Sequence, residues 1–402
     1  MFHARAAEPS RAASTNVCQI VKNKLVTSNN LFQSFLMGGF ECSTHRRGDG
    51  KRLDVIAGTR HDEFARQDYE RMINIGVLTA RDGTRWHLIE KTPCEYDFSS
   101  VIGQIRAARE TKMQVIWDLF HYGYPDDLDI MSAEFVNRFA AFAGKFTEFL
   151  ISEKVVTPYL CPVNEISFFA WAVGEVGWWF PKFRGRGNEL KRQLIKASIA
   201  AARTIKSIAP NAVLIQTDPI INVLPLAKTP DDTFHAQNYH NSQYQALDMI
   251  TGKINPELGG SLNIIDAIGV NFYPTNQWRH RGGRRVFRGN RSYKPFSEML
   301  REFYERYKIP LFVAETGTEA DDRADWFRYV CDEVKIAIER GIPVLGICLY
   351  PIVNHPGWDD DRHCENGLWD YPNDAGMREI YEPLAVEVGK ERDFPKNVLV
   401  NK

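Results

Sequence analysis

The sequence predicts a single (β/α)8 barrel of the α/β class, and three observations support this. From residue 31 onward, short apolar runs alternate with segments of helical periodicity. Eight such runs occur, mostly apolar throughout, which is typical of a parallel sheet covered by helices. No GxGxxG motif follows the first run, so an open dinucleotide-binding sheet lacks its main support.

The predicted elements follow one another in regular order. The strands are expected over residues 31–42, 77–86, 114–120, 155–166, 212–220, 267–273, 310–315 and 343–350. Apolar residues three and four apart predict helices over 62–75, 99–111, 189–208, 291–307 and 324–340, with a last helix within 375–388. A further helix carries five phenylalanines on one face, which we interpret as core: Phe135, Phe139, Phe142, Phe146 and Phe149.

The length and composition fit one catalytic domain. The chain has 402 residues, of which 44% are hydrophobic and 25% are charged, as in ordinary globular proteins. A (β/α)8 barrel accommodates residues 31–402 as one domain. Residues 1–30 mix basic and small polar residues without an apolar segment, so we expect a flexible N-terminal extension rather than a secretory signal.

Charge and cysteine content argue against several classes of function. The net charge of −1 gives no reason to expect binding to nucleic acid or to an anionic membrane surface. No apolar run is long enough to span a membrane. The seven scattered cysteines include no CxxC pair, which argues against a zinc site or disulfide framework and favours a reducing, cytoplasmic compartment.

Two of the predicted strands end in a glutamate. Val163-Asn164-Glu165 closes the fourth strand, and Ala314-Glu315 closes the seventh. A carboxylate at the end of a buried strand is costly unless it is paired or protonated, so a salt-bridged structural role is the alternative for each. In a barrel the carboxyl ends of all strands share one face, so both glutamates should enter the same mouth. A pair of carboxylates is what glycoside hydrolysis requires.

In these positions the chain resembles the family 1 β-glycosidases, which are retaining glycoside hydrolases of clan A, over residues 31–372. Asn164-Glu165 is similar to the family's acid/base motif, and Glu315-Thr316-Gly317 is similar to its Glu-Asn-Gly nucleophile motif. Further matches stand in the family's order at predicted strand ends: Arg81 with Trp86, His121 before Pro125, Asn271-Phe272-Tyr273, Tyr350 to Trp358, and Asn366-Gly367-Leu368.

The resemblance implies a role for each matching residue. Glu165 would be the general acid/base, and Glu315 the nucleophile that Arg81 and Tyr273 keep charged. The residues expected to form the substrate site are Glu41, Arg81, Trp86, His121, Asn164, Tyr273, Tyr350 and Trp358. Structural roles are the alternatives: a salt bridge from Arg81 to Asp82 or to a neighbouring carboxylate, and core packing for His121 and Tyr273.

The chain departs from the family where the sugar would be held. Gly357 stands in place of the glutamate that grips the glycone, Tyr350 replaces a tryptophan, and Glu41 replaces a glutamine. The sugar specificity of the family therefore cannot be transferred to this sequence. Asp359, Asp360 and Asp361 follow Gly357 and are candidates to replace the missing glutamate, although a solvated loop is the alternative.

Each of two loops on the same face can have either of two roles. Trp171, Trp178, Trp179 and Phe180 could be platforms for sugar rings or could anchor their loop by packing. Six arginines crowd the loop after the sixth strand and could attract an anionic group or belong to a solvated lid: Arg279, Arg281, Arg284, Arg285, Arg288 and Arg291.

The leading hypothesis is a retaining β-glycoside hydrolase that acts on a β-linked glycoside or short oligosaccharide. A transglycosylase with the same chemistry and a catalytically inactive barrel that binds carbohydrate or a partner are the alternatives. We expect no cofactor and no metal, because the candidate site has no cluster at metal-ligand spacing. The glycone, the aglycone and the oligomeric state stay open at this point.

Overall fold

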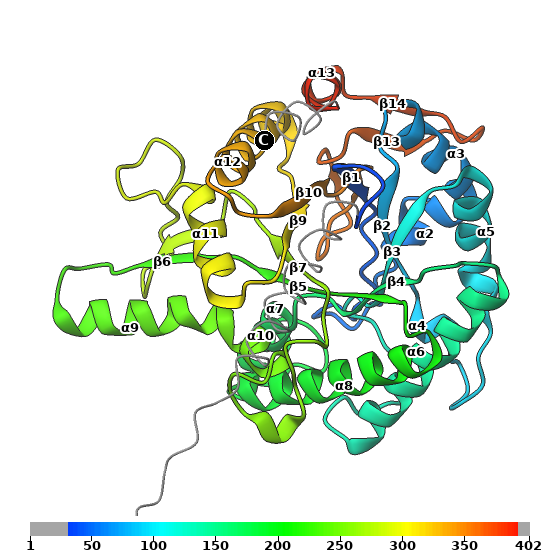
Figure 1. The fold of residues 1–402 in the computed structure, drawn as a ribbon, viewed down its shortest axis with the longest axis horizontal. Helices are drawn as coiled ribbons and strands as arrows, with labels where there is room; N and C mark the ends of the chain where they lie inside the picture. The colour runs from blue at the N-terminus through cyan, green and yellow to red at the C-terminus, as the bar shows by residue number, and fades with distance from the viewer. Residues whose placement is uncertain (1–30, 393–402) are drawn as a thin grey trace, which may run out of the picture.

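The computed structural model describes residues 31–392 and shows a closed barrel of eight parallel strands surrounded by helices (Figure 1). The strands follow chain order around the barrel, and β1 closes it by pairing with both β2 and β10. They are β1 (Leu36–Gly39), β2 (Thr79–Gly83), β3 (Gln114–Phe120), β4 (Tyr159–Val163), β5 (Val213–Pro219), β7 (Ala267–Asn271), β9 (Leu311–Thr316) and β10 (Val344–Leu349). The predicted (β/α)8 fold is confirmed. The extension predicted for residues 1–30 lies outside the described residues, as do residues 393–402.

Helices cover the outside of the barrel, and α6 shows why the sequence forms them. The helices are α2 (Val55–Gly58), α3 (His61–Asn74), α4 (Trp86–Ile89), α5 (Ile102–Thr111), α6 (Ala133–Ser152), α7 (Ile166–Phe169), α8 (Gly187–Ile208), α9 (Pro230–Asn241), α10 (Gln245–Ile250), α11 (Phe296–Tyr307), α12 (Arg323–Glu339) and α13 (Glu382–Glu391). The Ser132 hydroxyl caps α6 by accepting from the Phe135 N–H (3.2 Å). Phe135, Phe139, Phe142 and Phe146 are fully buried, so the predicted core face is confirmed. Within residues 31–392, no helix is both long and apolar enough to cross a membrane.

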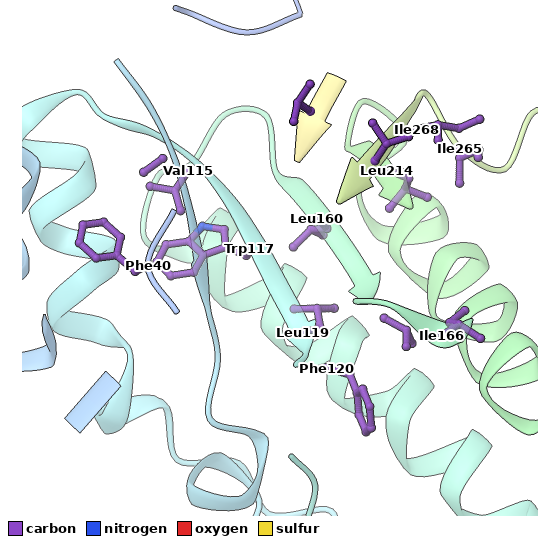
Figure 2. Packing of buried hydrophobic residues seen from close by; sticks show 14 of the residues in the cluster. Phe40, Val115, Trp117, Leu119, Phe120, Leu160, Ile166, Leu214, Ile265 and Ile268 are labelled. Atoms are coloured by element: carbon purple, nitrogen blue, oxygen red, sulfur yellow. The ribbon is translucent and has the colours of Figure 1, made fainter. Parts of the chain in front are cut away.

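Two apolar layers lie on opposite faces of the strands. Val115, Trp117 and Leu119 of β3 belong to the layer between barrel and helices (Figure 2). Ile116 of the same strand belongs to a separate buried cluster with Ile215 and Phe312, which fills the barrel interior. Because strand side chains alternate, polar residues that follow this interior cluster come to lie at the barrel mouth.

Some elements begin or end elsewhere than predicted. The strand expected over residues 155–166 is confined to β4, and Ile166 already belongs to α7. The strand expected over 77–86 ends at Gly83, before α4. The helix expected within 375–388 begins only at Glu382, because the chain first turns at Gly376 (φ 77°) and forms a hairpin of β13 (Trp369–Pro372) and β14 (Arg378–Ile380).

Two small sheets lie in the loops that follow barrel strands. One joins β6 (Asn222–Leu224), which follows β5, to β8 (Gln277–Arg279), which follows β7. The other pairs β11 (His355–Pro356) with β12 (His363–Cys364) after β10. Figure 1 shows α9 and β6 projecting from the barrel. Residues of these loops form much of the wall of one large pocket.

Candidate active site

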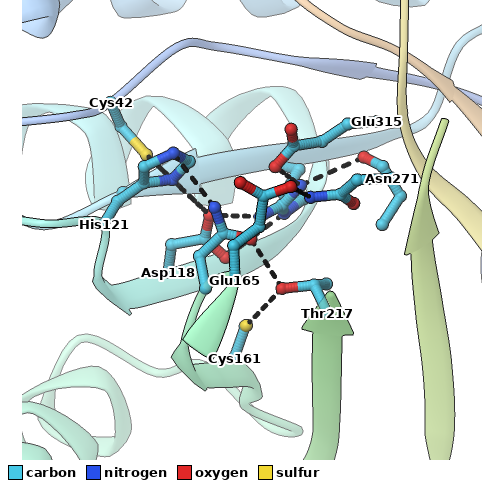
Figure 3. Close-up of polar contacts among 12 residues, drawn as sticks. Cys42, Asp118, His121, Cys161, Glu165, Thr217, Asn271 and Glu315 are labelled. Carbon is cyan, nitrogen blue, oxygen red and sulfur yellow. Dashed lines mark hydrogen bonds and ion pairs between the residues drawn. The ribbon is translucent and has the colours of Figure 1, made fainter. Parts of the chain in front are cut away.

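Two glutamates at the carboxyl ends of barrel strands line one pocket. Glu165 follows β4, and Glu315 is the next-to-last residue of β9. They are 7% and 4% exposed, and both line a cavity of about 1680 Å³. Figure 3 shows the two carboxylates near each other above the strand ends. The structure thus brings together the two residues that the sequence predicted to share one mouth.

The backbone at this site takes an uncommon conformation at two positions. Glu165 (φ 47°, ψ 56°) and Tyr122 (φ 71°) are both left-handed. For residues other than glycine this costs about 1 kcal/mol or more, and it persists where the surroundings hold it. Here the Glu165 N–H donates to the Thr217 carbonyl (3.1 Å), while the Glu165 carbonyl accepts from the Phe169 N–H (2.9 Å). These bonds end β4 and begin α7 at Glu165.

Glu165 has neutral hydrogen-bond partners only. The Tyr122 hydroxyl donates to Oε2, and the Asn271 amide donates to Oε1 at 2.8 Å. Burial, followed by the negative charge of Glu315, raises the pKa of Glu165 to about 8. Glu165 is therefore protonated at neutral pH and can donate a proton.

Glu315 has a cation beside it. The Arg81 guanidinium donates to Oε1 at 2.7 Å, and the Tyr273 hydroxyl donates to Oε2 at 2.9 Å. Burial raises the pKa of Glu315, but the positive charges of Arg81 and His121 oppose that rise. Since no cation contacts Glu165, Glu315 is the member of the pair that ionises first.

Arg81 belongs to a buried network rather than to the pocket wall. It is 1% exposed, pairs with Asp118 (2.7 Å) and donates to the side-chain oxygen of Asn164 (2.8 Å). The structural salt bridge considered as an alternative forms with Asp118 of the neighbouring strand and not with Asp82, which lies on the opposite face of β2. Asn164 is fully buried, and its oxygen also accepts from the Thr217 hydroxyl (2.7 Å). Arg81 and Asn164 therefore act on the carboxylates and their surroundings, and a direct sugar contact for either has no support in the geometry.

Glu41 lines the pocket and forms a second charged pair with His121, whereas His121, predicted to contact substrate, is buried and is not part of the pocket wall. His121 Nε2 lies 3.6 Å from Glu41 Oε1, and its Nδ1 lies 3.0 Å from Asp118. Burial alone would lower the pKa of His121, but Glu41 and Asp118 raise it above its ordinary value. Burial alone would likewise raise the pKa of Glu41, but His121 and His355 lower it. Glu41, predicted where the family has glutamine, is thus a buried anion in the pocket wall.

Tyr350 and Trp358, both predicted to contact substrate, line the pocket. The Tyr350 hydroxyl and the Trp358 indole nitrogen are buried and find no hydrogen-bond partner within residues 31–392. The same is true of the side-chain oxygen of Asn366, another residue of the wall. Buried polar atoms normally have partners, so these three atoms are available to a ligand.

Trp86 is the predicted site residue that the structure places elsewhere. It is fully buried, stacks on Phe142 (5.3 Å between ring centroids) and donates from Nε1 to Glu90 at 2.6 Å. The prediction that Trp86 binds substrate is therefore wrong. The reason is that β2 ends three residues earlier, at Gly83, and the chain enters α4 under the phenylalanine face of α6.

Only some residues of the aromatic and charged loops line the pocket, and the others contact the rest of the protein. Trp171 and Trp178 line the pocket, whereas Trp179 is buried and stacks on His45 (3.7 Å). Asp361 pairs with Arg47 and Lys51 outside the pocket. Asp359 and Asp360 do line it. From the arginine-rich loop, Arg285 and Arg288 contribute to the wall, and Arg288 also pairs with Asp325.

The sequence did not single out three residues that hold the site together. Asp118 pairs with Arg81 and His121, Tyr122 contacts Glu165, and Asn271 donates to Glu165. Asn271 stood within a matching motif, but only its Tyr273 was assigned a role. Asp118, by contrast, left a usable signal: it is the only charged residue in the apolar run of residues 114–120.

One group of potential metal ligands lies beside the site. The ligand atoms of Cys42, Asp118 and His121 lie within 4.8 Å of one another, and all three residues are buried. Asp118 is already paired with Arg81 at 2.7 Å, and that guanidinium opposes a second cation. The hydrogen bond between His121 and Asp118 accounts for the closeness of the group. That no metal is needed stays a prediction.

Comparison with solved structures confirms the resemblance at the level of fold. A family 1 β-glucosidase from Thermotoga maritima matches with a TM-score of 0.73 and 16% identity, over 90% of this chain and 98% of that one. The β-glucosidase of that organism in complex with glucoimidazole matches equally well, over 99% of its chain. The AHE enzyme from Alicyclobacillus herbarius matches with a TM-score of 0.72 and 13% identity, over 90% and 99% of the two chains.

The sequence itself gives no match to a known protein family model or to a curated protein. The chain thus has the fold of the family 1 β-glucosidases, at a level of identity that shows the fold and not the activity. What the pocket does must be argued from its own residues.

Proposed function

We propose that the protein is a retaining β-glycoside hydrolase. Glu315 attacks the anomeric carbon of a bound β-glycoside while Glu165 gives its proton to the departing oxygen, so the glycosidic bond breaks as the glycosyl–Glu315 ester forms. Glu165, now charged, then takes a proton from water. That water attacks the anomeric carbon and releases Glu315, which restores both residues.

The observation that carries this proposal is the unequal surroundings of two buried carboxylates. Glu315 contacts Arg81 and Tyr273, whereas Glu165 contacts only neutral donors, and its pKa is raised to about 8. An acid and a nucleophile must hold opposite protonation states at one pH, and this asymmetry provides them. A purely structural pair of carboxylates would be more stable with a cation for each.

The pocket wall supports a polyhydroxylated ligand. Glu41 offers a charged acceptor, and Tyr350, Trp358 and Asn366 offer polar atoms without partners in the described chain. Sugar hydroxyls both donate and accept, so they suit such a mixed wall. Solved structures of the same fold hold sugar-like inhibitors, among them deoxynojirimycin in the Thermotoga maritima enzyme.

Transglycosylation uses the same first step and differs only in the acceptor of the glycosyl group. An inactive binding barrel would retain the pocket but would form no covalent intermediate. A trapping experiment therefore separates catalysis from mere binding before the acceptor is addressed.

The test uses a panel of activated 2-fluoro β-glycosides that differ in glycone, followed by intact mass measurement and peptide mapping. We expect one glycone to add a single glycosyl mass on Glu315. The variant Glu315→Gln should take no label. The variant Glu305→Gln, which changes an exposed carboxylate of α11 paired with Arg301, should label normally.

A label on Glu165 instead of Glu315 would reverse the proposed roles. If no glycoside labels the folded protein, the proposal of a retaining hydrolase is wrong.

A further inference from the structure

The pocket continues beyond Glu165 toward the first turns of α8. Ser167, two residues after Glu165, lines it, and so do Lys191 of α8 and Gln245 of α10. Because Glu165 would protonate the departing oxygen, this side of the pocket is where the aglycone would lie. That assignment rests on the function proposed above.

Lys191 is a buried cation without a negative partner. It is 8% exposed, and its ammonium donates to the Gln245 side-chain oxygen at 2.9 Å. Among residues 31–392 it forms no ion pair, whereas the buried Arg81 pairs with both Asp118 and Glu315. Burial lowers the pKa of Lys191. An ammonium has three N–H donors, and a buried one is costly unless it is paired.

Two carboxyl groups, Asp218, whose charge acts on Lys191, and Glu175, beside the start of α8, form hydrogen bonds with other groups. Asp218 accepts from both the N–H (3.0 Å) and the hydroxyl (2.7 Å) of Ser167, and burial raises the pKa of Asp218 to about 7. Glu175 accepts from the Gly187 N–H at the start of α8 (3.2 Å). The charge of Asp218 opposes the effect of burial on the pKa of Lys191, but neither carboxylate forms an ion pair with its ammonium, which therefore stays available on the pocket side.

Aromatic rings line the same pocket as Lys191. Trp171 and Trp178 are 39% and 41% exposed, and Trp278 of β8 also lines the pocket. Exposed indole faces suit a flat ring, which can stack on them. The wall therefore offers an aromatic surface and, in Lys191, a buried positive charge without an ion pair; Arg285 of the same wall is exposed and lies over the Trp278 ring (5.6 Å).

We propose that the aglycone or acceptor of this enzyme is a ring-bearing compound with an anionic group, such as a carboxylate, and that Lys191 binds that group. The ligand's charge supplies the partner that the protein does not. A salt bridge with a buried ammonium is worth more than a neutral hydrogen bond in the same place, which makes the charge a determinant of specificity.

Calorimetric titration of the full chain with two matched phenols measures binding alone. It therefore tests the role of Lys191 without requiring a catalysed reaction. The probes are 4-hydroxybenzoate and 4-hydroxybenzamide, which share shape and phenol but differ in charge. We expect the unsubstituted protein to bind the benzoate about tenfold or more tightly than the benzamide. The variant Lys191→Met should bind both alike, and Lys196→Met, an exposed lysine of the same helix, should retain the preference.

The comparison within the unsubstituted protein needs no variant, so misfolding of one variant cannot hide the answer. Equal binding of the two phenols, or a preference that survives Lys191→Met in folded protein, overturns the inference. If no 2-fluoro glycoside labels Glu315 but the Lys191-dependent preference is found, then the proposed hydrolase function fails while the anion site stands.

Discussion

Two buried networks of charged side chains begin at adjacent residues of β2 and lie on opposite faces of that strand. Arg81 enters the barrel mouth, where it contacts Asp118 and Glu315. Asp82 lies between barrel and helices, where it contacts His61 (3.0 Å) and Tyr69 (2.6 Å). Both networks are almost inaccessible to water. One strand thus carries two sets of buried charges that can be compared directly.

In the outer network each carboxylate has at least one cation. His61 lies between Asp82 and Asp68, and Asp68 also pairs with Arg378 of β14 (2.7 Å) and with Arg71 of α3 (2.5 Å). Burial opposes every charge here, yet the partners raise the pKa of His61 to about 9 and lower the pKa values of Asp68 and Asp82. All members are held in their charged forms.

In the inner network carboxylates outnumber cations. Glu41, Asp118, Glu165 and Glu315 share the two cations Arg81 and His121. Because the two cations cannot balance four negative charges, one carboxyl group stays protonated. That group is Glu165, whose pKa is raised to about 8. The difference indicates that the outer network was built for stability, whereas the inner network keeps an exchangeable proton at the cost of stability. The predictions below test this division.

The largest effect is expected at the nucleophile. Glu315→Gln keeps the shape of the side chain but removes the attacking oxygen, so kcat/KM on an activated aryl glycoside should fall about 10⁴-fold or more. Folding should survive, since a buried negative charge is removed from a network that has too many. Thermal unfolding of variant and unsubstituted protein checks the second point, and a large loss of stability would contradict the comparison.

Azide distinguishes the two carboxylates. In Glu165→Ala, azide should attack the trapped glycosyl–Glu315 ester and give a glycosyl azide of retained configuration. In Glu315→Ala, azide should replace the nucleophile and give the inverted product. The configuration of each product, read by NMR, is the measurement. If the two outcomes are exchanged, the roles of Glu165 and Glu315 are exchanged as well.

The outer network should show the opposite pattern. His61→Leu leaves Asp82 buried without a cation, and breaking a buried pair costs about 3–5 kcal/mol of unfolding free energy. The kcat of the fraction that remains folded should change little. Urea unfolding gives the first quantity and active-site titration the second. Arg66→Ala, which removes an exposed ion pair from the same helix, is the matched control and should have little effect.

The two tyrosines of the site should move opposite ends of the pH profile. Protonated Glu165 is needed for the first step, so kcat/KM should fall about tenfold per pH unit above pH 8. The Tyr122 hydroxyl stabilises charged Glu165, so Tyr122→Phe should shift this alkaline limb to higher pH. Tyr273→Phe removes a donor from charged Glu315 and should shift the acid limb to higher pH. If neither limb of the pH profile of kcat/KM moves in these variants, the assignments are contradicted.

The fold and the position of Glu165 and Glu315 in one pocket were predictable from sequence because each rests on a local pattern. Apolar runs specify strands whatever their partners, and Glu165 and Glu315 stand at the ends of such runs. Trp86 was misassigned because spacing along a chain does not show where a strand stops, and β2 stops at Gly83. Lys191 gave no signal, since its lack of a carboxylate partner depends on how α8 packs beside α10 in three dimensions.

The smallest effect concerns the pH dependence of stability, and it follows from His61 alone. Its pKa is about 9 in the folded protein and near 6.5 when unfolded, so between these values the folded state holds the extra proton. Stability from this proton is fully present below pH 6.5 and is lost as the pH rises toward 9.

Asp68 and Asp82 have lowered pKa values, and their contribution is lost only in acid, outside this window. Glu165 and Asp218 also titrate near neutrality, but they do so equally in the unsubstituted protein and in His61→Leu. The difference in unfolding free energy between those two proteins should therefore narrow from pH 6.5 to 9 in urea titrations. Parallel curves over this range would mean that His61 is not charged in the folded state, and the outer network would then lack the matched charges on which the comparison rests.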